Sequence, residues 1–307
     1  IYQENIMKWL MHDNANIMIQ AYAGCGKTST LIEMMKLLPK EKTKFYCAFN
    51  KDIVDEITSK TSEIENLKIS TIHSLGYHII QRNNDEKIKV DENKYIVHIN
   101  NNIEDYSTEY ETLNYNNKLK LKSNVKKLIN YARNNLCSGT KCLTDLAKKF
   151  GIVCVGDEIS VVQKLLKWGK ANLNTIDYCD MVWLPNVLPY KFPWFDFIFV
   201  DEAQDLSVAQ QQIVLKSHNI KTRYIFCGDE YQSIYGFAGA DSESFNTLKN
   251  TPNTKVYNLP ICYRCGDLIV DFASQFVNGI KHNELNNKGL VKFNGIIDDI
   301  KFNFFQI

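Results

Sequence analysis

The residues best suited to chemistry are a lysine, a threonine and a few acids, each of which follows a short apolar run. The segment QAYAGCGKTSTL follows the apolar residues 17–19 and places Lys27 and Thr28 after several alanines and glycines. Small residues let backbone N–H groups converge on anionic oxygens, as a bound phosphate requires. The lysine would bring a positive charge to the β- and γ-phosphates, and the threonine hydroxyl would ligate Mg²⁺. The sequence therefore predicts a phosphate-binding loop.

The elements around this loop support the interpretation. The β-branched run before it indicates a buried strand, and the apolar spacing from Leu31 to Leu38 predicts a helix that Pro39 ends. The strict loop pattern has glycine where this chain has Ala21, which is the next smallest residue. The alternative is a chance glycine-rich turn before a helix. The order of strand, loop, Gly-Lys-Thr and helix favours the phosphate-binding loop.

The acids follow similar apolar runs later in the chain. Asp201 and Glu202 come after the run 197–200, and Asp229 comes after the run 223–227. With further strand candidates at 45–48 and 69–72 and helices between them, the pattern predicts an α/β fold with a parallel, doubly wound sheet. Ligands bind at the carboxyl ends of such strands, so these acids and Lys27 are expected to share one site. The alternative is that Asp201 or Asp205 caps the next helix.

Length and charge limit the possible classes of protein. A chain of 307 residues with 45% hydrophobic residues can bury a sizeable core and is expected to form two domains. The net charge of +1 gives no global basic field, so any nucleic-acid contact must come from a local patch. No apolar run approaches the roughly 20 residues of a membrane span, and no signal peptide is visible. Both ends look cut, since the chain starts at Ile1 and not at a methionine, and its last segment, KFNGIIDDIKFNFFQI, stops without an obvious finish.

The cysteines indicate a reducing compartment. The chain has nine of them, an odd number, and most lie in apolar runs where a free cysteine behaves as a small hydrophobe. Cys262 and Cys265 have metal-like spacing, but no second pair accompanies them, so zinc is not expected. We therefore expect an intracellular protein of the cytoplasm or nucleus.

Residues 83–182 differ in composition from the segments before and after them. Asn, Lys and Glu dominate, and apolar residues recur at helical spacing, which predicts a mainly helical insertion. Within it, a basic stretch runs from Lys118 through Lys122, Lys126 and Lys127 to Arg133. Such a stretch could follow a phosphate backbone, and a solvated helix face is an equal alternative.

Four motifs together resemble one family. AYAGCGKT, TIHS, VDEAQD and GDEYQSIYGFAGA resemble the motifs of superfamily 1A DNA helicases of the UvrD/Rep type, over about residues 1–275 without most of the insertion. The segment AFNK and the phrasing around the acidic motif look closest to the F-box DNA helicase branch. The resemblance implies a RecA-like P-loop fold with motor domain 1A at 1–82 and 183–259. It also implies a 1B-like insertion at 83–182 and the start of a 2A-like second motor domain at 260–307.

The resemblance also implies roles for the residues that match the family's motifs. Glu202 would activate water, Gln232 would sense the γ-phosphate, and Arg264 would contact it together with Lys27. Thr28 and Asp201 would hold Mg²⁺. The ATP-binding residues implied are Gln3, Ala23, Gly24, Cys25, Gly26, Lys27, Thr28, Ser29, Tyr263 and Arg264, with Gln3 and Tyr263 at the adenine. The single-strand DNA track would include Phe49, Asn50, Thr71, His73, Tyr235 and Phe237.

Alternatives remain for some of these residues. Phe49 and Tyr235 could instead pack in the core, and His73 could be a satisfied buried histidine. Ser29 and Ala238 stand where the family often has arginine, which weakens one phosphate or DNA contact at each position.

The implied activity is that of an ATP-dependent DNA helicase. It would use ATP and Mg²⁺, move 3′→5′ on single-stranded DNA, and act on single-stranded DNA and its junctions with duplex. Because the second motor domain barely starts, this chain alone is expected to bind ATP and hydrolyse it poorly. Alternatives are the motor of a helicase–nuclease and a non-unwinding, ATP-gated factor that binds DNA or remodels proteins. An unrelated P-loop kinase would lack Gln232 and the aromatic residues after it.

Overall fold

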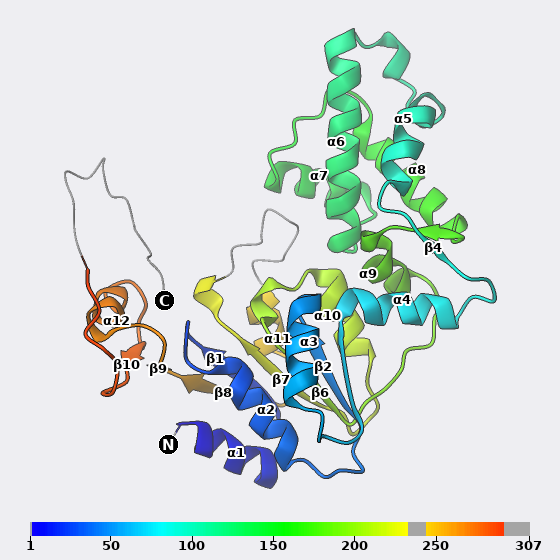
Figure 1. Ribbon diagram of the computed structural model, residues 1–307. Coiled ribbons are helices and arrows are strands. Elements are labelled where there is room, and N and C mark those ends of the chain that lie inside the picture. Colours follow the sequence, from blue (N-terminus) through cyan, green and yellow to red (C-terminus); the bar gives the residue numbers. More distant parts are fainter. Residues whose placement is uncertain (1, 233–243, 292–307) are drawn as a thin grey trace.

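A six-stranded parallel sheet forms the centre of the protein (Figure 1). The computed structural model describes residues 2–232 and 244–291. The strand order is β3-β2-β6-β7-β1-β8. The strands are β1 (Asn16–Ala21), β2 (Lys44–Ala48), β3 (Leu67–Thr71), β6 (Phe197–Val200), β7 (Arg223–Gly228) and β8 (Thr254–Leu259). The α/β class with a parallel sheet, predicted from the alternation of apolar runs and helices, is confirmed.

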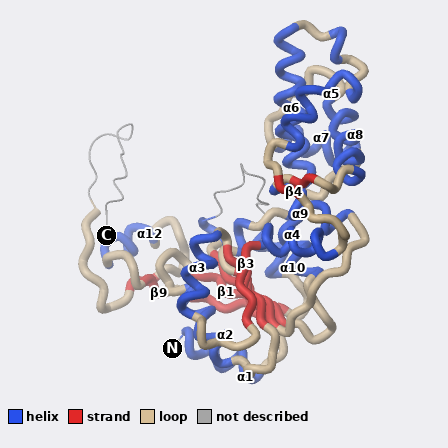
Figure 2. Tube along the Cα trace, turned by 45° about the vertical axis from the view of Figure 1, so that its right-hand side comes forward, coloured by secondary structure: helices blue, strands red, loops and turns tan. Residues whose placement is uncertain are grey.

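Helices cover both faces of this sheet, as Figure 2 shows. One face packs against α1 (Tyr2–His12), α2 (Lys27–Leu37) and α3 (Lys51–Lys60). The other packs against α4 (Ile72–Arg82), α10 (Val208–Lys216) and α11 (Ser244–Lys249). Every residue of β2 and β6 is buried, because a strand covered on both faces has no solvent side. Their continuous apolar runs made them recognisable in the sequence.

Strand β8 was not predicted. It lies at the edge of the sheet and pairs with β1 in parallel register, from Asn16 opposite Thr254 to Ala21 opposite Leu259. Its sequence TKVYNL contains polar residues, and most of its side chains are partly or fully exposed. A half-exposed edge strand lacks the apolar run by which a buried strand is recognised.

The insertion is a block of helices that stands apart from the sheet (Figures 1 and 2). It contains α5 (Lys94–Tyr106), η1 (Tyr110–Thr112), α6 (Tyr115–Asn134), α7 (Thr140–Lys149), α8 (Glu158–Ala171) and α9 (Tyr178–Val187). A short parallel pair, β4 (Lys89–Val90) and β5 (Thr175–Ile176), joins the two ends of the block. Because these helices share a separate apolar core, the predicted mainly helical insertion is confirmed.

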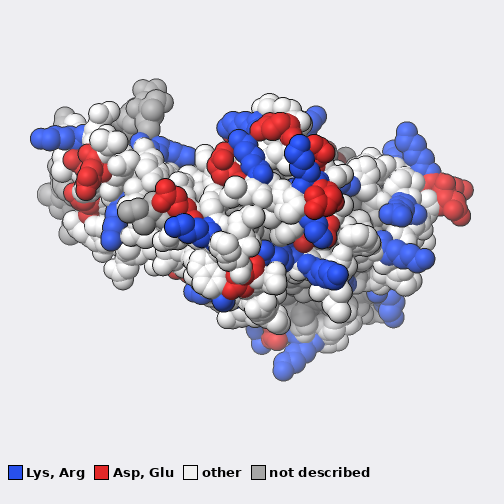
Figure 3. Space-filling model, turned by 90° about the horizontal axis from the view of Figure 1, so that it is seen from below, with Lys and Arg blue, Asp and Glu red and all other residues white. Residues whose placement is uncertain are grey.

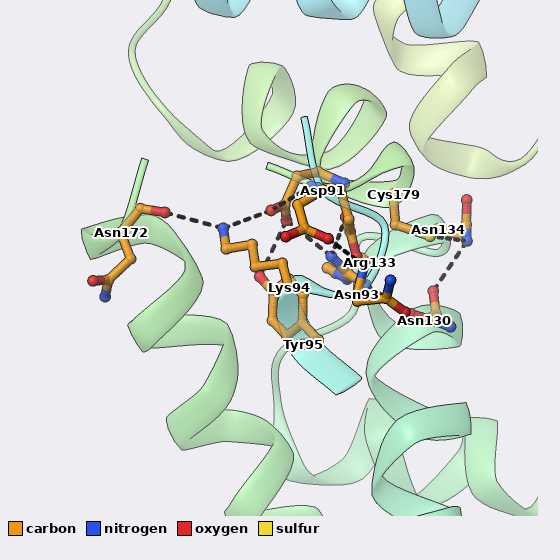
Figure 4. A network of polar contacts seen from close by, with 11 residues as sticks. Asp91, Asn93, Lys94, Tyr95, Asn130, Arg133, Asn134, Asn172 and Cys179 are labelled. Atoms are coloured by element: carbon orange, nitrogen blue, oxygen red, sulfur yellow. Dashed lines mark hydrogen bonds and ion pairs between the residues drawn. The ribbon is translucent and has the colours of Figure 1, made fainter. Parts of the chain in front are cut away.

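A buried ionic network links helices α5, α6 and α9 of the insertion (Figure 4). Arg133, which is fully buried, places Nη1 2.7 Å from Asp177 Oδ1 and 2.9 Å from Asp180 Oδ1. Lys94 Nζ lies 2.7 Å from the other oxygen of Asp180, and the hydroxyl of Tyr95 donates to that carboxylate. The prediction that Arg133 belongs to a basic surface stretch is therefore wrong, because two interior carboxylates neutralise it.

The rest of the predicted basic stretch is also partly paired. Lys118 forms an ion pair with Glu111 at 2.8 Å, and Lys122 donates to the carbonyl of Asn100. On the face of the molecule seen from below, the basic and acidic side chains of the described residues are interspersed (Figure 3). This mixture agrees with the small net charge of +1.

The insertion joins the motor through a close helix contact. Helices α4 and α9 pack side by side, and a Cβ at Gly76 of α4 would overlap the backbone carbonyl of Met181 in α9. Only glycine allows two helix backbones to approach so closely.

The last described segment packs on the loop between β1 and α2. It contains β9 (Ile261–Cys262), α12 (Asp267–Ala273) and β10 (Lys281–His282). The backbone N–H of Tyr263 donates to the carbonyl of Gly24 at 2.9 Å, and the hydroxyl of Tyr22 donates to the carbonyl of Asn278 at 2.6 Å. These bonds attach residues 260–291 to the predicted phosphate-binding loop.

Two further features concern cysteines and membranes. Cys137 and Cys142 form a disulfide across the turn between α6 and α7, a pairing the sequence did not predict, and the other seven cysteines are free. Within residues 2–232 and 244–291, no helix has both the length and the apolar character needed to cross a bilayer.

Candidate functional site

The predicted phosphate-binding loop connects β1 to α2. Gly24 and Gly26 both adopt left-handed backbone conformations, with φ of 69° and 78°, which favour glycine. A Cβ at Gly24 would lie 2.7 Å from Cβ of Arg264, so any side chain at position 24 would collide with Arg264. No side chain caps the start of α2. The first amides of this helix therefore point into the loop, as at helix ends that bind anions.

Lysine, threonine and two acids meet at this loop. Lys27 Nζ lies 2.8 Å from Glu202 Oε2, and Thr28 Oγ1 lies 3.3 Å from Asp201 Oδ2. The hydroxyl of Tyr46, from the middle of β2, donates to the same Asp201 oxygen at 2.7 Å. The acids come from the tip of β6 and the first two residues from the start of α2. The expected convergence at one edge of the sheet is thus present.

Burial and charge shift the pKa values of these groups. Burial raises the pKa of the Asp201 carboxyl, and the neighbouring charge of Glu202 raises it further, while the Tyr46 hydrogen bond opposes both. For Lys27, burial lowers the pKa of the ammonium, but attraction to Glu202 outweighs it and the pKa lies above its ordinary value. Lys27 therefore stays charged in the fold.

The acids do not act as helix caps. Helix α10 is capped by Ser207, whose side chain accepts from the N–H of Gln210 in a reciprocal capping box. The alternative in which Asp201 or Asp205 caps this helix is therefore wrong. Glu202 instead has φ 49°, a left-handed conformation uncommon outside glycine, which turns the chain sharply after β6.

The tip of β7 continues the same site. Gln232 donates from Nε2 to Asp229 Oδ2 at 2.6 Å, within the short helix η3 (Glu230–Gln232) and the residue before it. The backbone N–H of Asp229 donates to Gln204 Oε1 at 3.0 Å, and Gln204 in turn contacts Glu202. Gln232 is therefore linked by hydrogen bonds to the acids at the tip of β6.

The residues predicted to contact adenine lie beside the loop. Gln3 donates to Thr30 Oγ1 at 3.1 Å, and its Nε2 would lie 3.1 Å from a Cβ at Gly26. Tyr263 is half exposed and follows β9 directly, and Arg264 is exposed beside Gly24. Of the remaining loop residues, Cys25 is buried, where burial raises the pKa of its thiol to about 12, and Ala23 and Ser29 are exposed.

The predicted DNA residues are more varied. Phe49 is 41% exposed after β2, so the core-packing alternative is wrong for this residue. Asn50 and Thr71 cap helices α3 and α4 by accepting from the N–H groups of Ile53 and Ser74. His73 is partly buried, and burial lowers the pKa of its imidazole. Tyr235, Phe237 and Ala238 lie outside the described residues.

The oxygen donors present fit Mg²⁺. A hydroxyl from Thr28 and a carboxylate from Asp201 are hard ligands, and Mg²⁺ in nucleotide sites takes one or two protein oxygens with phosphate and water. In the described part of the chain, no group of three or more His, Cys, Asp or Glu side chains is arranged to hold a metal ion. A metal at this site would therefore depend on the nucleotide for part of its coordination.

Comparison with known proteins gives the family. The UvrD/REP helicase N-terminal domain matches residues 3–253. The chain belongs to this family. The predicted resemblance to UvrD/Rep helicases is thus confirmed. F-box DNA helicases are among the similar proteins, as that prediction also expected.

Several relatives of this UvrD/REP helicase domain are similar at about a quarter identity. F-box DNA helicase protein 1 of Schizosaccharomyces pombe is 26% identical, over 94% of this chain and 34% of the relative. ATP-dependent DNA helicase Rep of Buchnera aphidicola (subsp. Acyrthosiphon pisum) is 25% identical, over 92% and 46%. F-box DNA helicase 1 of Gallus gallus is 26% identical, over 94% and 28%. The chain spans less than half the length of each of these relatives.

Sequence reasoning about this UvrD/REP helicase domain missed three polar residues of the site. They are Tyr46, Gln204 and Asp205, of which the first holds Asp201 and the others adjoin Glu202. Tyr46 lies within an apolar run and gave no signal. Gln204 and Asp205 were visible in VDEAQD, but their contacts depend on how β6 and β7 lie side by side.

Proposed function

We propose that this chain carries the ATP-binding part of an ATP-dependent DNA helicase. Hydrolysis of ATP would be coupled to 3′→5′ movement on single-stranded DNA and to unwinding of duplex. The observation that carries the proposal is the contact of Lys27 and Thr28 with Glu202 and Asp201 at one edge of the sheet. Family membership and relatives named as ATP-dependent DNA helicases support it.

Each site residue has a role that follows from its position. The glycine loop and the free amides of α2 would hold the phosphates, with the Lys27 ammonium at the β/γ position. Thr28 and Asp201 would hold Mg²⁺, which neutralises phosphate charge when bound. Glu202 pairs with Lys27 at 2.8 Å, and a triphosphate would replace it as the partner of that lysine. The released carboxylate could then take a proton from the attacking water.

The remaining contacts to ATP follow from the family. Gln3 and Tyr263 would hold the adenine, and Arg264 and Gln232 would contact the γ-phosphate. Ala23, Gly24, Cys25, Gly26 and Ser29 complete the proposed ATP-binding set.

Single-stranded DNA and its junctions with duplex are the proposed partners. Phe49 is exposed next to the cap of α3 and offers an aromatic face for stacking on a base. The proposed track also includes Asn50, Thr71, His73, Tyr235 and Phe237.

We propose domain boundaries on the same basis. Residues 1–82 and 183–259 form motor domain 1A, 83–182 form a 1B-like insertion, and 260–307 begin a 2A-like domain. The separate apolar core of the insertion supports the first division. We also propose that the protein is intracellular, in a reducing compartment; seven of the nine cysteines are free and agree with this, and the Cys137–Cys142 disulfide is the exception.

The test is DNA-stimulated ATP hydrolysis by the intact protein. Lys27→Ala should abolish it, while Lys40→Ala, at an exposed lysine paired with Glu65, should leave it unchanged. Glu202→Gln should lower kcat by about 10²- to 10⁴-fold and retain ATP binding, because it removes the proton acceptor alone. Undiminished hydrolysis in Lys27→Ala would refute the assignment of the phosphate site.

A strand-displacement assay tests the coupling. Duplexes with a 3′ or a 5′ single-stranded tail should be opened only from the 3′ tail. Hydrolysis without opening would instead indicate the non-unwinding factor, and cleavage of the strands would indicate a helicase–nuclease.

A further inference from the structure

Gln204 lies between the tips of β6 and β7 and contacts groups from both. Its side chain is 2% exposed. Oε1 accepts from the backbone N–H of Asp229 at 3.0 Å, while Nε2 donates to Glu202 Oε2 at 2.9 Å and to Asp205 Oδ2 at 3.1 Å. The amide therefore bridges an acid of the β6 tip and the backbone of the β7 tip.

The neighbouring strand leaves room for this amide. A Cβ at Gly228, the last residue of β7, would overlap Gln204 Oε1. Gly228 has no positive φ, so its backbone conformation does not require glycine. The tightest contact of an added Cβ would be with Gln204 Oε1, followed by Ala203 N and a ring carbon of Phe245 at 3.2 Å each, so the missing side chain chiefly lets the Gln204 carbonyl oxygen reach Asp229.

The bridge continues on both sides. Glu202 Oε2 accepts hydrogen bonds from both Lys27 Nζ and Gln204 Nε2, so two donors fix this end of the carboxylate. On the other side, Asp229 accepts from Gln232 at 2.6 Å. Hydrogen bonds thus join Glu202 to Gln204 and Gln204 to the backbone of Asp229, whose own side chain binds Gln232.

An amide is suited to this place because it donates and accepts at once. Its Nε2 faces two carboxylates, and its Oε1 faces a backbone N–H. A carboxylate here would offer no proton to Glu202, and an apolar side chain would leave the N–H of Asp229 without its partner.

We propose that Gln204 is a positioning residue that orients the Glu202 carboxylate and links it to the Asp229–Gln232 segment. The inference rests on the proposed function, in which Glu202 is the proton acceptor. Gln204 acts through Glu202 and not on ATP itself, so its loss should lower kcat and spare KM. Because these hydrogen bonds extend to Gln232, the loss of Gln204 should also reduce the factor by which DNA stimulates hydrolysis.

The first test replaces the amide in the intact protein. Gln204→Leu should lower the kcat of DNA-stimulated ATP hydrolysis about 10- to 100-fold, part of the usual contribution of a positioned base, with KM for ATP changed less than about twofold. Gln211→Leu is the matched control, since Gln211 is also 2% exposed but donates to the backbone carbonyl of Leu206 and not to a carboxylate. It should leave kcat unchanged.

The second test uses pH. Gln204→Glu keeps the shape of the side chain but loses the donor when ionised. Protonation restores an O–H that can donate to Glu202 while the other oxygen still accepts from Asp229. The ratio of wild-type kcat to Gln204→Glu kcat should therefore decrease as the pH falls from about 8.5 to about 6.5. The corresponding ratio for Gln204→Leu should stay constant. A residue with only a structural role would give no such difference between the two variants.

The third test uses the glycine. Gly228→Ala should lower kcat in the wild-type background, because the new methyl group displaces the Gln204 amide. In a Gln204→Ala background the same change should have a smaller further effect, since the overlapping atom is gone and the remaining neighbours, Ala203 N and a ring carbon of Phe245, lie at 3.2 Å. Additive losses would overturn the proposal.

The outcomes separate this proposal from the proposed function. If wild-type protein shows no DNA-stimulated hydrolysis, the proposed function fails. If wild type is active, Lys27→Ala is inactive and Gln204→Leu keeps full kcat, only the positioning role is refuted. A raised KM with unchanged kcat in Gln204→Leu would refute it as well.

Discussion

Asp205 is a carboxylate whose ionisation the fold opposes, and its replacement tests the electrostatics of the site. Burial and the nearby charge of Glu202 raise the pKa of Asp205 to about 6, from an ordinary value of 3.8. Its Oδ2 accepts from Gln204, and its Oδ1 is buried with no hydrogen-bond partner among the described residues. An ionised oxygen in that position is costly.

The direction of the pH effect follows from these two values. Between pH 3.8 and about 6 the folded protein holds a proton that the unfolded chain has released. Stability therefore falls as the pH rises through this window and stays reduced above it. The difference between the two pKa values corresponds to about 3 kcal/mol, and partial exposure of the group reduces this to roughly 1–2 kcal/mol.

Asp205→Asn should therefore raise the free energy of unfolding by roughly 1–2 kcal/mol at pH 8, because the neutral amide carries no buried charge. The advantage should shrink as the pH is lowered through 6 toward 4. Urea unfolding followed by circular dichroism at several pH values measures both effects, with Asp145→Asn at an exposed position as the control. A variant no more stable than wild type at pH 8, or one with the same advantage at every pH, would refute the reasoning.

Three other predictions concern the insertion, helix α10 and the loop after β1. Arg133→Met should cost about 3–5 kcal/mol of stability in urea unfolding, because Asp177 loses its cation and the buried Asp180 keeps only Lys94. Lys127→Met on the exposed side of the same helix should change the stability by less than about 0.5 kcal/mol. An equal effect of both would show that the interior network does not stabilise the insertion. Ser207→Ala should lower the melting temperature through a loss of about 1 kcal/mol, since α10 loses its cap and the reciprocal bond from Gln210; no change would mean that the cap is replaced by solvent. Gly24→Ala should weaken binding of a fluorescent ATP analogue about tenfold or more. The left-handed φ of 69° is strained for alanine, and the added carbon would lie 2.7 Å from a neighbouring side-chain carbon. Unchanged affinity would argue against a tight loop.

Much of the fold follows from local patterns in the chain. The strands of the sheet interior were predictable because burial on both faces demands continuous apolar runs, as in residues 197–200. The helix after the phosphate-binding loop was predictable from spacing, and its end at Leu37 falls next to Pro39. The edge strand β8 was not, because its exposed face permits polar residues such as Lys255.

The site was predictable only where a residue type carries its own chemistry. Lys27, Thr28, Asp201 and Glu202 were recognised because charge and hydroxyl groups after strands indicate phosphate and metal binding. The pairing of Arg133 was not recognised, because its partners lie more than forty residues away along the chain. Which side of a helix is interior depends on the elements that pack on it, and a basic side chain reads the same in sequence whether it is buried or exposed.

The contact of α4 with α9 at Gly76 has a mechanical consequence. At the point where Gly76 meets the carbonyl of Met181, no side chain separates the two helix backbones. A tilt of the insertion would therefore move α4 with it, and α4 starts directly after β3 with Thr71 as its cap. Because β3 is an edge strand of the sheet, a displacement of the insertion would reach the carboxyl end of that strand through α4.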